Sequence, residues 1–101
     1  MSYTDIILWN NKNKYIAAIC AAPSILGRMG ILEGKNATCF PGFEGELKGA
    51  KLADVKQRVV TDGNIITSRG MGTSVDLGLE LVKLLAGEEK AEELAVSTQY
   101  R

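Results

Sequence analysis

The nine residues from Tyr15 to Pro23, Tyr-Ile-Ala-Ala-Ile-Cys-Ala-Ala-Pro, constrain the fold more than any other part of this sequence. A short apolar run of this kind predicts a buried strand, here one that ends at Cys20 and turns directly into a helix. Pro23 suits the first turn of that helix, where its missing N–H costs nothing. Ala18 and Ala22, on either side of Cys20, match the spacing of a nucleophile elbow, a tight strand-to-helix turn that lifts the middle side chain into a cleft.

A cysteine at such a turn has two interpretations. In the functional one, unpaired N–H groups at the helix start stabilise the Cys20 thiolate and could also receive an oxyanion. In the structural one, Cys20 is a packing residue, because free cysteine is among the most buried residue types and an alanine-rich strand accommodates it. The local pattern alone leaves the two interpretations about equally open.

The composition excludes several classes of protein. The chain has 101 residues, 46% of them hydrophobic, and its 12 basic residues equal its 12 acidic ones, so we expect one globular unit that does not bind nucleic acid. It has no histidine and only two cysteines, Cys20 and Cys39, which excludes a histidine-ligated metal, a Cys/His dyad within the chain and a disulfide framework. We therefore expect no metal and no cofactor.

Neither a membrane segment nor an export signal is expected. No apolar segment reaches the roughly 20 residues needed to span a bilayer. The N-terminal residues lack the basic start of a signal peptide. We expect a cytoplasmic location without membrane association.

Periodicity and turn signals predict the elements along the chain. Thr4 is the expected cap of the first helix, and Trp9 is expected to anchor that helix to the sheet. Asp62-Gly63 predicts a tight turn between two strands. The predicted helices are residues 4–11, 24–29, 74–85 and 88–96, and the predicted strands are residues 15–20, 37–40, 58–61 and 64–68, with a loop containing a turn of helix over residues 43–56.

The third of these helices has the clearest pattern. Val75, Leu79, Val82 and Leu85 recur at helical spacing, and Thr73 or Ser74 is the expected cap, with Gly87 as the end.

Strands that alternate with helices predict an α/β layer structure with a largely parallel sheet. The number of strands is short for such a domain, which normally has about five and places an elbow near the middle of its sheet. Here the first strand already carries Cys20, so we expect this strand at or near a sheet edge, with unpaired backbone groups and one apolar face uncovered.

Three segments resemble one known family. They are residues 17–23 (Ala-Ala-Ile-Cys-Ala-Ala-Pro), residues 38–44 (Thr-Cys-Phe-Pro-Gly-Phe-Glu) and residues 62–73 (Asp-Gly-Asn-Ile-Ile-Thr-Ser-Arg-Gly-Met-Gly-Thr). In this order they closely resemble the ThiJ/PfpI superfamily, and within it the branch of the Parkinson's-disease protein deglycase. The resemblance extends over nearly all of residues 3–97.

The resemblance implies a flavodoxin-like, class I glutamine amidotransferase-like three-layer sandwich, of which residues 1–101 form only the C-terminal half. The family's opening strands, a glutamate that hydrogen-bonds the reactive cysteine and a glycine-rich turn would precede Met1. The chain is therefore expected to be one piece of a split domain, whether by a divided gene, proteolysis or cloning. Its expected partner is a complementary N-terminal fragment, and the completed domain is expected to form a homodimer.

The resemblance also implies roles for single residues. Cys20 matches the family's reactive cysteine, and Ala21 matches the residue whose backbone N–H faces the substrate. Phe40 stands where several members have a histidine beside the cysteine, so acid/base help from that position is missing. Pro41 and residues 68–70 match positions at the pocket rim and the dimer contact.

Three functions follow as hypotheses. In the first, the completed domain acts on reactive carbonyls as a glyoxalase or deglycase, a hydrolase or lyase, with Cys20 as the nucleophile and the Ala21 N–H as the oxyanion donor. In the second, oxidation of Cys20 makes the protein an oxidative-stress sensor or chaperone. In the third, the chain is an inactive structural half.

Three further features have plainer interpretations. Cys39 is expected to be a core residue rather than the partner of Cys20 in a regulatory disulfide. Residues 70–72, Gly-Met-Gly, faintly suggest a phosphate loop, but Val75 stands where the dinucleotide fingerprint has its third glycine. Arg69 is either a solvated rim residue, an anion contact or an interface residue.

Overall fold

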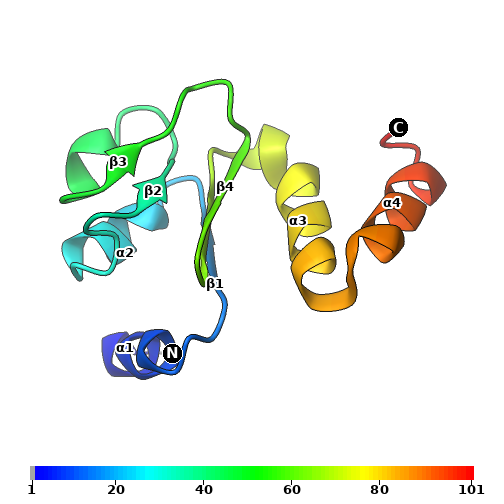
Figure 1. The fold of residues 1–101 in the computed structure, drawn as a ribbon. Coiled ribbons are helices and arrows are strands. Elements are labelled where there is room, and N and C mark those ends of the chain that lie inside the picture. The colour runs from blue at the N-terminus through cyan, green and yellow to red at the C-terminus, as the bar shows by residue number, and fades with distance from the viewer. Residues whose placement is uncertain (1) are drawn as a thin grey trace.

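The computed structural model describes residues 2–101, which form a central three-stranded sheet with elements on both of its faces. Figure 1 shows this sheet edge-on, with α1, α2 and a small second sheet on one side and α3 and α4 on the other. The strand order of the central sheet is β1-β5-β4, and β2 pairs with β3 in the small sheet. Strands and helices therefore form layers, as their alternation along the sequence predicts.

The central sheet combines parallel and antiparallel pairing. β1 runs parallel to β5, with Ile16 opposite Ile65, and β4 runs antiparallel to β5. The predicted tight turn between β4 and β5 is confirmed, and Gly63 takes the positive φ of 61° that it needs. The expected largely parallel sheet is wrong for this part of the fold, because so short a turn joins only antiparallel strands. The strands are Ile16–Ile19 (β1), Val59–Asp62 (β4) and Ile65–Ser68 (β5).

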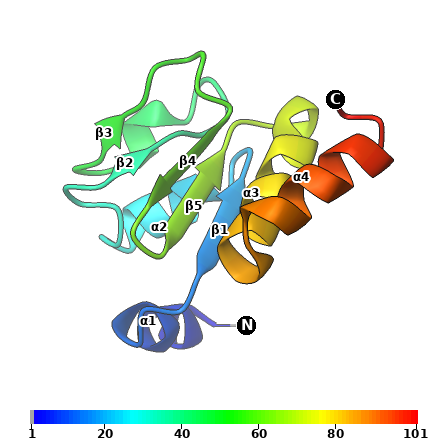
Figure 2. The ribbon, with the colours of Figure 1, turned by 45° about the vertical axis from the view of Figure 1, so that its right-hand side comes forward.

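β1 is an outer strand of this sheet in the described chain, as expected. Figure 2 shows it bordered by β5 on one side only. Its burial is correspondingly incomplete, since Ala18 is buried but Ala17 is exposed. β1 therefore has the apolar sequence of an interior strand, although it lies at an edge of the sheet.

The hydrophobic core lies between the central sheet and the short helix α2, Pro23–Arg28. This helix approaches the 3-10 turn η1, Glu44–Glu46, very closely at Gly27, where a Cβ would lie only 2.2 Å from the carbonyl oxygen of Glu46. Only glycine allows these two backbones to approach so closely. The buried residues of the core are Ala18, Leu26, Leu32, Ala37, Cys39, Leu47 and Ile65.

Of the strand predicted over residues 37–40, only Ala37 lies in a strand, and that strand belongs to the small sheet. β2 covers only Asn36–Ala37 and pairs in parallel with β3, Lys51–Leu52. The next residues bond to single groups of β5 and of the turn after β1 instead of forming a ladder. The Thr38 N–H donates to the Thr67 hydroxyl oxygen at 3.0 Å, and the Phe40 N–H donates to the Cys20 carbonyl oxygen at 2.7 Å.

Helix α1, Tyr3–Asn11, differs from expectation in its cap and its packing. Its cap is Ser2 rather than Thr4, and the Asp5 carboxylate accepts from the Ser2 N–H at 3.0 Å, which completes a capping box. Trp9 is 37% exposed and is not one of the residues that pack against the core. Ile6 is the residue of this helix that packs against the core.

Helices α3, Ser74–Ala86, and α4, Glu88–Ser97, are separated by Gly87, as predicted. Neither Thr73 nor Ser74 caps α3 through its side chain. The Thr73 hydroxyl donates to the carbonyl oxygen of Gly70, which precedes the 3-10 turn η2 (Met71–Thr73), and the Ser74 hydroxyl donates to that of Met71. No helix in residues 2–101 is long and apolar enough to cross a bilayer.

The apolar face predicted for α3 is not fully covered. Leu79 and Val82 are half-buried, whereas Val75 and Leu85 are 51% and 72% exposed. No residue of this helix is buried, although apolar side chains cover more than half of its circumference and only Asp76, Glu80 and Lys83 form a charged stripe.

Candidate active site

Cys20 follows β1 directly and has a positive φ of 66°. This conformation costs an L-residue about 1–2 kcal/mol, and such strain gathers at functional sites. Two hydrogen bonds hold the residue there: its N–H donates to the Ser68 carbonyl oxygen at 3.2 Å, and its own carbonyl oxygen accepts from the Phe40 N–H at 2.7 Å. Strand, strained cysteine and helix thus form the predicted elbow geometry.

The backbone after the cysteine leaves a donor free. The Ala21 carbonyl oxygen accepts from the Ser24 hydroxyl at 2.6 Å and from the Ser24 N–H at 3.0 Å. The Ala21 N–H itself donates no hydrogen bond to any group in residues 2–101. It is therefore available to a ligand beside the half-buried Cys20.

The two small neighbours of the cysteine differ in their surroundings. Ala18 is buried at 8% exposure within the core, so a larger side chain there would meet packed atoms. Ala22 is exposed, and the described chain leaves room for a larger side chain there. In this structure, a small residue is therefore required at Ala18 but not at Ala22. The elbow spacing alone suggests that both positions require one.

Phe40 forms the rim next to Cys20. Its ring lies against Gly70, so that a Cβ on this glycine would be 3.3 Å from a ring carbon, and the side chain is 45% exposed. A phenyl ring has no titratable proton, and the chain has no histidine. Proton transfer at Cys20 therefore requires a group other than the side chain at position 40.

A buried hydroxyl network fixes the strand end that holds Cys20, and sequence reasoning missed it. Ser68 Oγ lies 2.7 Å from the Arg58 carbonyl oxygen and 2.6 Å from Thr73 Oγ1. The Gly70 N–H donates to Thr73 Oγ1 at 3.2 Å. The sequence signal for this network was the presence of three hydroxyl residues close to a strand end, Thr67, Ser68 and Thr73. Such side chains often form hydrogen bonds with nearby backbone groups.

Cys39 is a core residue, as predicted, and is only 3% exposed. Both cysteines are free, so the structure contains no Cys20–Cys39 disulfide. Burial raises the pKa of the Cys39 thiol, and the Glu44 carboxylate raises it further, against smaller opposing effects of Arg69 and the Phe43 backbone. A small pocket of about 220 Å³ lies here, and Arg69 and Glu44 also line it.

Hydrogen bonds from backbone N–H groups lower the pKa of Glu44. The first cause is its own N–H, and the second is that of Gly42, which donates to Glu44 Oε1 at 2.8 Å. Arg69 adds a smaller effect in the same direction. The carboxylate is fully exposed, so these contacts define a local turn rather than a buried acid.

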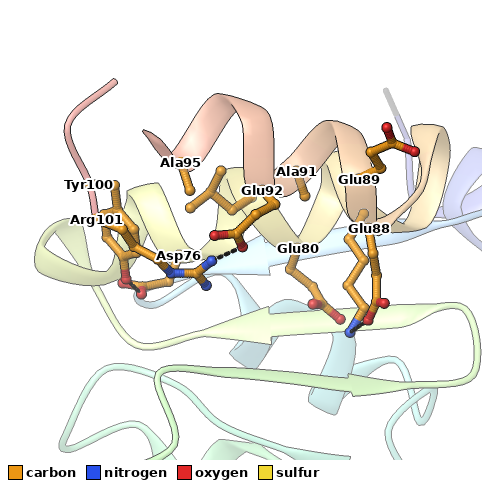
Figure 3. Close-up of a pocket in the computed structure, with 11 residues that line it drawn as sticks. Asp76, Glu80, Glu88, Glu89, Ala91, Glu92, Ala95, Tyr100 and Arg101 are labelled. Carbon is orange, nitrogen blue, oxygen red and sulfur yellow. Dashed lines mark hydrogen bonds and ion pairs between the residues drawn. The ribbon is translucent and has the colours of Figure 1, made fainter. Parts of the chain in front are cut away.

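A larger hollow of about 570 Å³ lies between α3 and α4, away from the elbow (Figure 3). Most of its charged groups already pair with one another or with neighbours: Asp76 with Arg58 and Tyr100, Glu92 with Arg101, Lys83 with Glu88, and Glu80 with the Thr61 hydroxyl. None of its lining residues comes from the elbow. Among residues 2–101, no three histidine, cysteine or acidic side chains are grouped as metal ligands would be.

Comparison with known proteins shows the family of the chain. The model of the DJ-1/PfpI family matches residues 9–84. The chain is 49% identical over 80 residues to protein DJ-1 homolog B of Arabidopsis thaliana, covering 78% of the chain and 18% of that protein. It is 37% identical over 75 residues to deglycase PYRAB04690 of Pyrococcus abyssi, covering 74% of the chain and 45% of that protein.

The crystal structure of Drosophila melanogaster DJ-1beta superposes with a TM-score of 0.87 at 37% identity. The superposition covers 95% of this chain but 52% of that one. The fold is thus the flavodoxin-like α/β fold of these proteins, and the chain spans about half the length of the solved structure. Whether Cys20 and Ala21 are catalytic stays a prediction.

Proposed function

Because this chain belongs to the DJ-1/PfpI family, whose model matches residues 9–84, we propose that Cys20 is the nucleophile of a glyoxalase- or deglycase-type reaction on reactive carbonyls. One observation carries the proposal: Cys20 is held at a φ of 66°, next to an Ala21 N–H that bonds to nothing in residues 2–101. A nucleophile beside a free donor is the minimum arrangement for attack on a carbonyl. The similarity to a protein named deglycase supports the same class of substrate.

The first step of the proposed reaction forms a bond between Cys20 Sγ and an aldehyde carbon of an α-oxoaldehyde or its protein adduct. The carbonyl π electrons move to the oxygen, which the Ala21 N–H stabilises by a hydrogen bond. A proton then moves from the former aldehyde carbon to the neighbouring carbonyl carbon, which leaves a thioester on Cys20. Water hydrolyses this thioester to a hydroxy acid and the free thiol. From a protein adduct, the amine leaves as Cys20 Sγ bonds to the carbon, so the repaired amine is released before the same steps follow. These proton transfers need an acid or base that Phe40 does not supply, and we assign that group to a complementary N-terminal part of the domain.

The same reasoning gives the proposed assembly. The chain covers 52% of the Drosophila structure, so the complementary part would have a similar length. It would supply the remaining strands, and the completed domain would form a homodimer in the cytoplasm.

Turnover of methylglyoxal tests the proposal. The chain together with its complementary part should consume methylglyoxal, and Cys20→Ser should abolish this while leaving the circular dichroism spectrum unchanged. Cys39→Ser is the matched control, because Cys39 lies in the core rather than at the elbow. Full activity of Cys20→Ser would refute the proposed nucleophile.

A redox role for the same thiol is the second candidate. Cys20 is half-buried and reachable, whereas Cys39 is 3% exposed, so peroxide should convert Cys20 selectively to sulfenic and then sulfinic acid. Mass spectrometry would show the gain of oxygen on the peptide with Cys20. Oxidation without methylglyoxal turnover would favour the redox role. Failure of both reactions in the assembled protein would favour an inactive structural half.

A further inference from the structure

The small pocket beside Cys39 is built from four segments that are distant in the chain. Its lining residues come from β2 and the residues after it, from the turn at Glu44, from β3 and the loop that follows, and from the end of β5. The Ala53 N–H donates to the Ala37 carbonyl oxygen at 3.0 Å, which extends the pairing of β2 with β3 along one wall. Figure 2 shows the small sheet beside β4, away from the open edge of β1. The pocket of about 220 Å³ therefore belongs to the packing of this chain itself.

Thr38 presents an unused hydroxyl group to this pocket. The residue is only 4% exposed, and its backbone N–H donates to the Thr67 hydroxyl oxygen. Its own side-chain oxygen has no hydrogen-bond partner in residues 2–101. No fully enclosed side-chain oxygen of these residues lacks a partner, so the Thr38 oxygen must reach open space. The pocket is the open space that Thr38 lines, and its hydroxyl is therefore available to a ligand there.

Arg69 brings an unused positive charge to the same pocket. The residue is half-buried, and within residues 2–101 its guanidinium group takes part in none of the ion pairs. An arginine is seldom buried without a partner, and its planar donors fit a carboxylate in a bidentate manner. Of the three roles that the sequence leaves open for Arg69, the pocket favours contact with an anion.

Glu44 supplies a separate negative charge. The Gly42 N–H donates to Glu44 Oε1 at 2.8 Å, which holds the carboxylate in place and leaves its second oxygen free. Glu44 and Arg69 line one pocket but do not form an ion pair with each other. Two opposite charges that face one cavity without touching are complementary to a ligand that carries both charges itself.

The remaining walls limit the size of the ligand and its apolar part. They are aliphatic, and two of them are still exposed, Leu52 by 53% and Val55 by 68%. Pockets for drug-sized ligands measure about 300–1,000 Å³, so a pocket of about 220 Å³ admits only a smaller molecule. The ligand that fits is a small zwitterion with a short aliphatic side chain.

We propose that this pocket binds a small aliphatic α-amino acid. Arg69 and the Thr38 hydroxyl hold its carboxylate, the Glu44 carboxylate holds its ammonium group, and the aliphatic walls contact its side chain. A 2-hydroxy acid of the same shape keeps the carboxylate but leaves Glu44 unpaired beside it, so it binds less well. The inference goes beyond the proposed function, because this pocket takes no part in the chemistry at Cys20.

The experiment titrates the isotope-labelled chain, alone and with its complementary part, with three probes of matched shape. L-Valine carries both charges, 2-hydroxyisovalerate lacks the ammonium group, and isobutylamine lacks the carboxylate. L-Valine should produce saturable shifts of the Thr38 and Ala53 amide signals and none at Ala91 in α4. Each of the other two probes should bind at least fivefold more weakly than L-valine.

Two variants assign the charges. Arg69→Gln should remove the preference for L-valine over isobutylamine, and Glu44→Gln should remove its preference over 2-hydroxyisovalerate, because each variant deletes the partner of the group that the analogue lacks. Arg28→Gln and Glu46→Gln are the matched controls, since these two residues pair with each other at 3.6 Å and do not line the pocket. Both controls should bind L-valine as tightly as the unmodified chain does.

Three results would overturn the inference. The first is the absence of saturable shifts at Thr38 and Ala53, and the second is binding of 2-hydroxyisovalerate as tight as that of L-valine. The third is self-association of the chain that Arg69→Gln abolishes while L-valine does not bind, which would assign Arg69 to an interface. Cys20→Ser should bind L-valine normally, so loss of methylglyoxal turnover in that variant tests the proposed chemistry alone.

Discussion

Replacing Gly27 by alanine should destabilise the protein, although alanine is the better helix former. In a helix interior, Gly→Ala normally adds about 1 kcal/mol to stability. At Gly27 the new Cβ would lie 2.2 Å from the Glu46 carbonyl oxygen and 2.8 Å from Leu47 Cα, both backbone atoms that cannot rotate away. Contacts under 3.0 Å essentially never occur for real Cβ atoms, so α2 and η1 would have to separate by roughly 1 Å.

That separation would loosen the core cluster to which Leu26 and Leu47 belong. Overpacking of this kind costs about 1–3 kcal/mol, and we expect Gly27→Ala to lose an amount in that range. Gly78→Ala in α3 is the matched control, because its Cβ would meet nothing within 4 Å, and it should gain about 1 kcal/mol.

Thermal and urea unfolding of the purified chain measure this pair of variants. A loss of 1 kcal/mol corresponds to a fall in Tm of about 4–8 °C for a domain of this size. The two variants should therefore move Tm in opposite directions. If Gly27→Ala proves as stable as the unmodified chain, the close approach of α2 to η1 does not exist.

The remaining predictions concern the elbow and the two thiols. Cys20→Gly should be more stable than Cys20→Ala by about 1 kcal/mol in urea unfolding, because only glycine adopts the positive φ without strain; equal stabilities would contradict that strain. Ala18→Val should cost about 1–3 kcal/mol by overpacking the core, whereas Ala22→Val at its exposed position should stay within about 0.5 kcal/mol; the reverse order would exclude the packing described for the elbow. Iodoacetamide at neutral pH should label Cys20 before Cys39, and peptide mapping with preferential labelling of Cys39 would reverse the assignment. Because burial raises the pKa of Cys39 in the folded state, its contribution to stability is complete below the ordinary thiol pKa and is lost as pH rises through the raised value. The stability difference between the unmodified chain and Cys39→Ala should therefore shrink at alkaline pH, and a constant difference would show that the thiol does not titrate differently on folding.

Local chemistry made the elbow readable from the sequence. The apolar run, the small residues around Cys20 and the proline after it each act within a few positions, so their consequences depend little on the rest of the fold. The hairpin at Gly63 and the helix break at Gly87 were equally local, since each needs a positive φ that glycine supplies at no cost. The three motifs in order also identified the family that the comparison confirms.

Tertiary structure decided what depends on partners distant in the chain. Residues 38–40 do not form a strand because Thr67 of β5 and Cys20, which follows β1, accept from the N–H groups of Thr38 and Phe40. Likewise, Ile6 packs against the core, whereas Trp9 is 37% exposed. The way in which α1 packs on the sheet decides which of its side chains faces the core, and the hydrophobicity of the side chains alone does not.

The sequence by itself therefore determined which residues turn, which cysteine stands at the turn and which segments are apolar, because these follow from side-chain chemistry over a few residues. Only the tertiary structure decided that Cys20 is strained between Ser68 and Phe40 and that the Ala21 N–H stays free. It also decided that an interior-type strand has an open edge, since strand order depends on pairing between segments far apart in the chain.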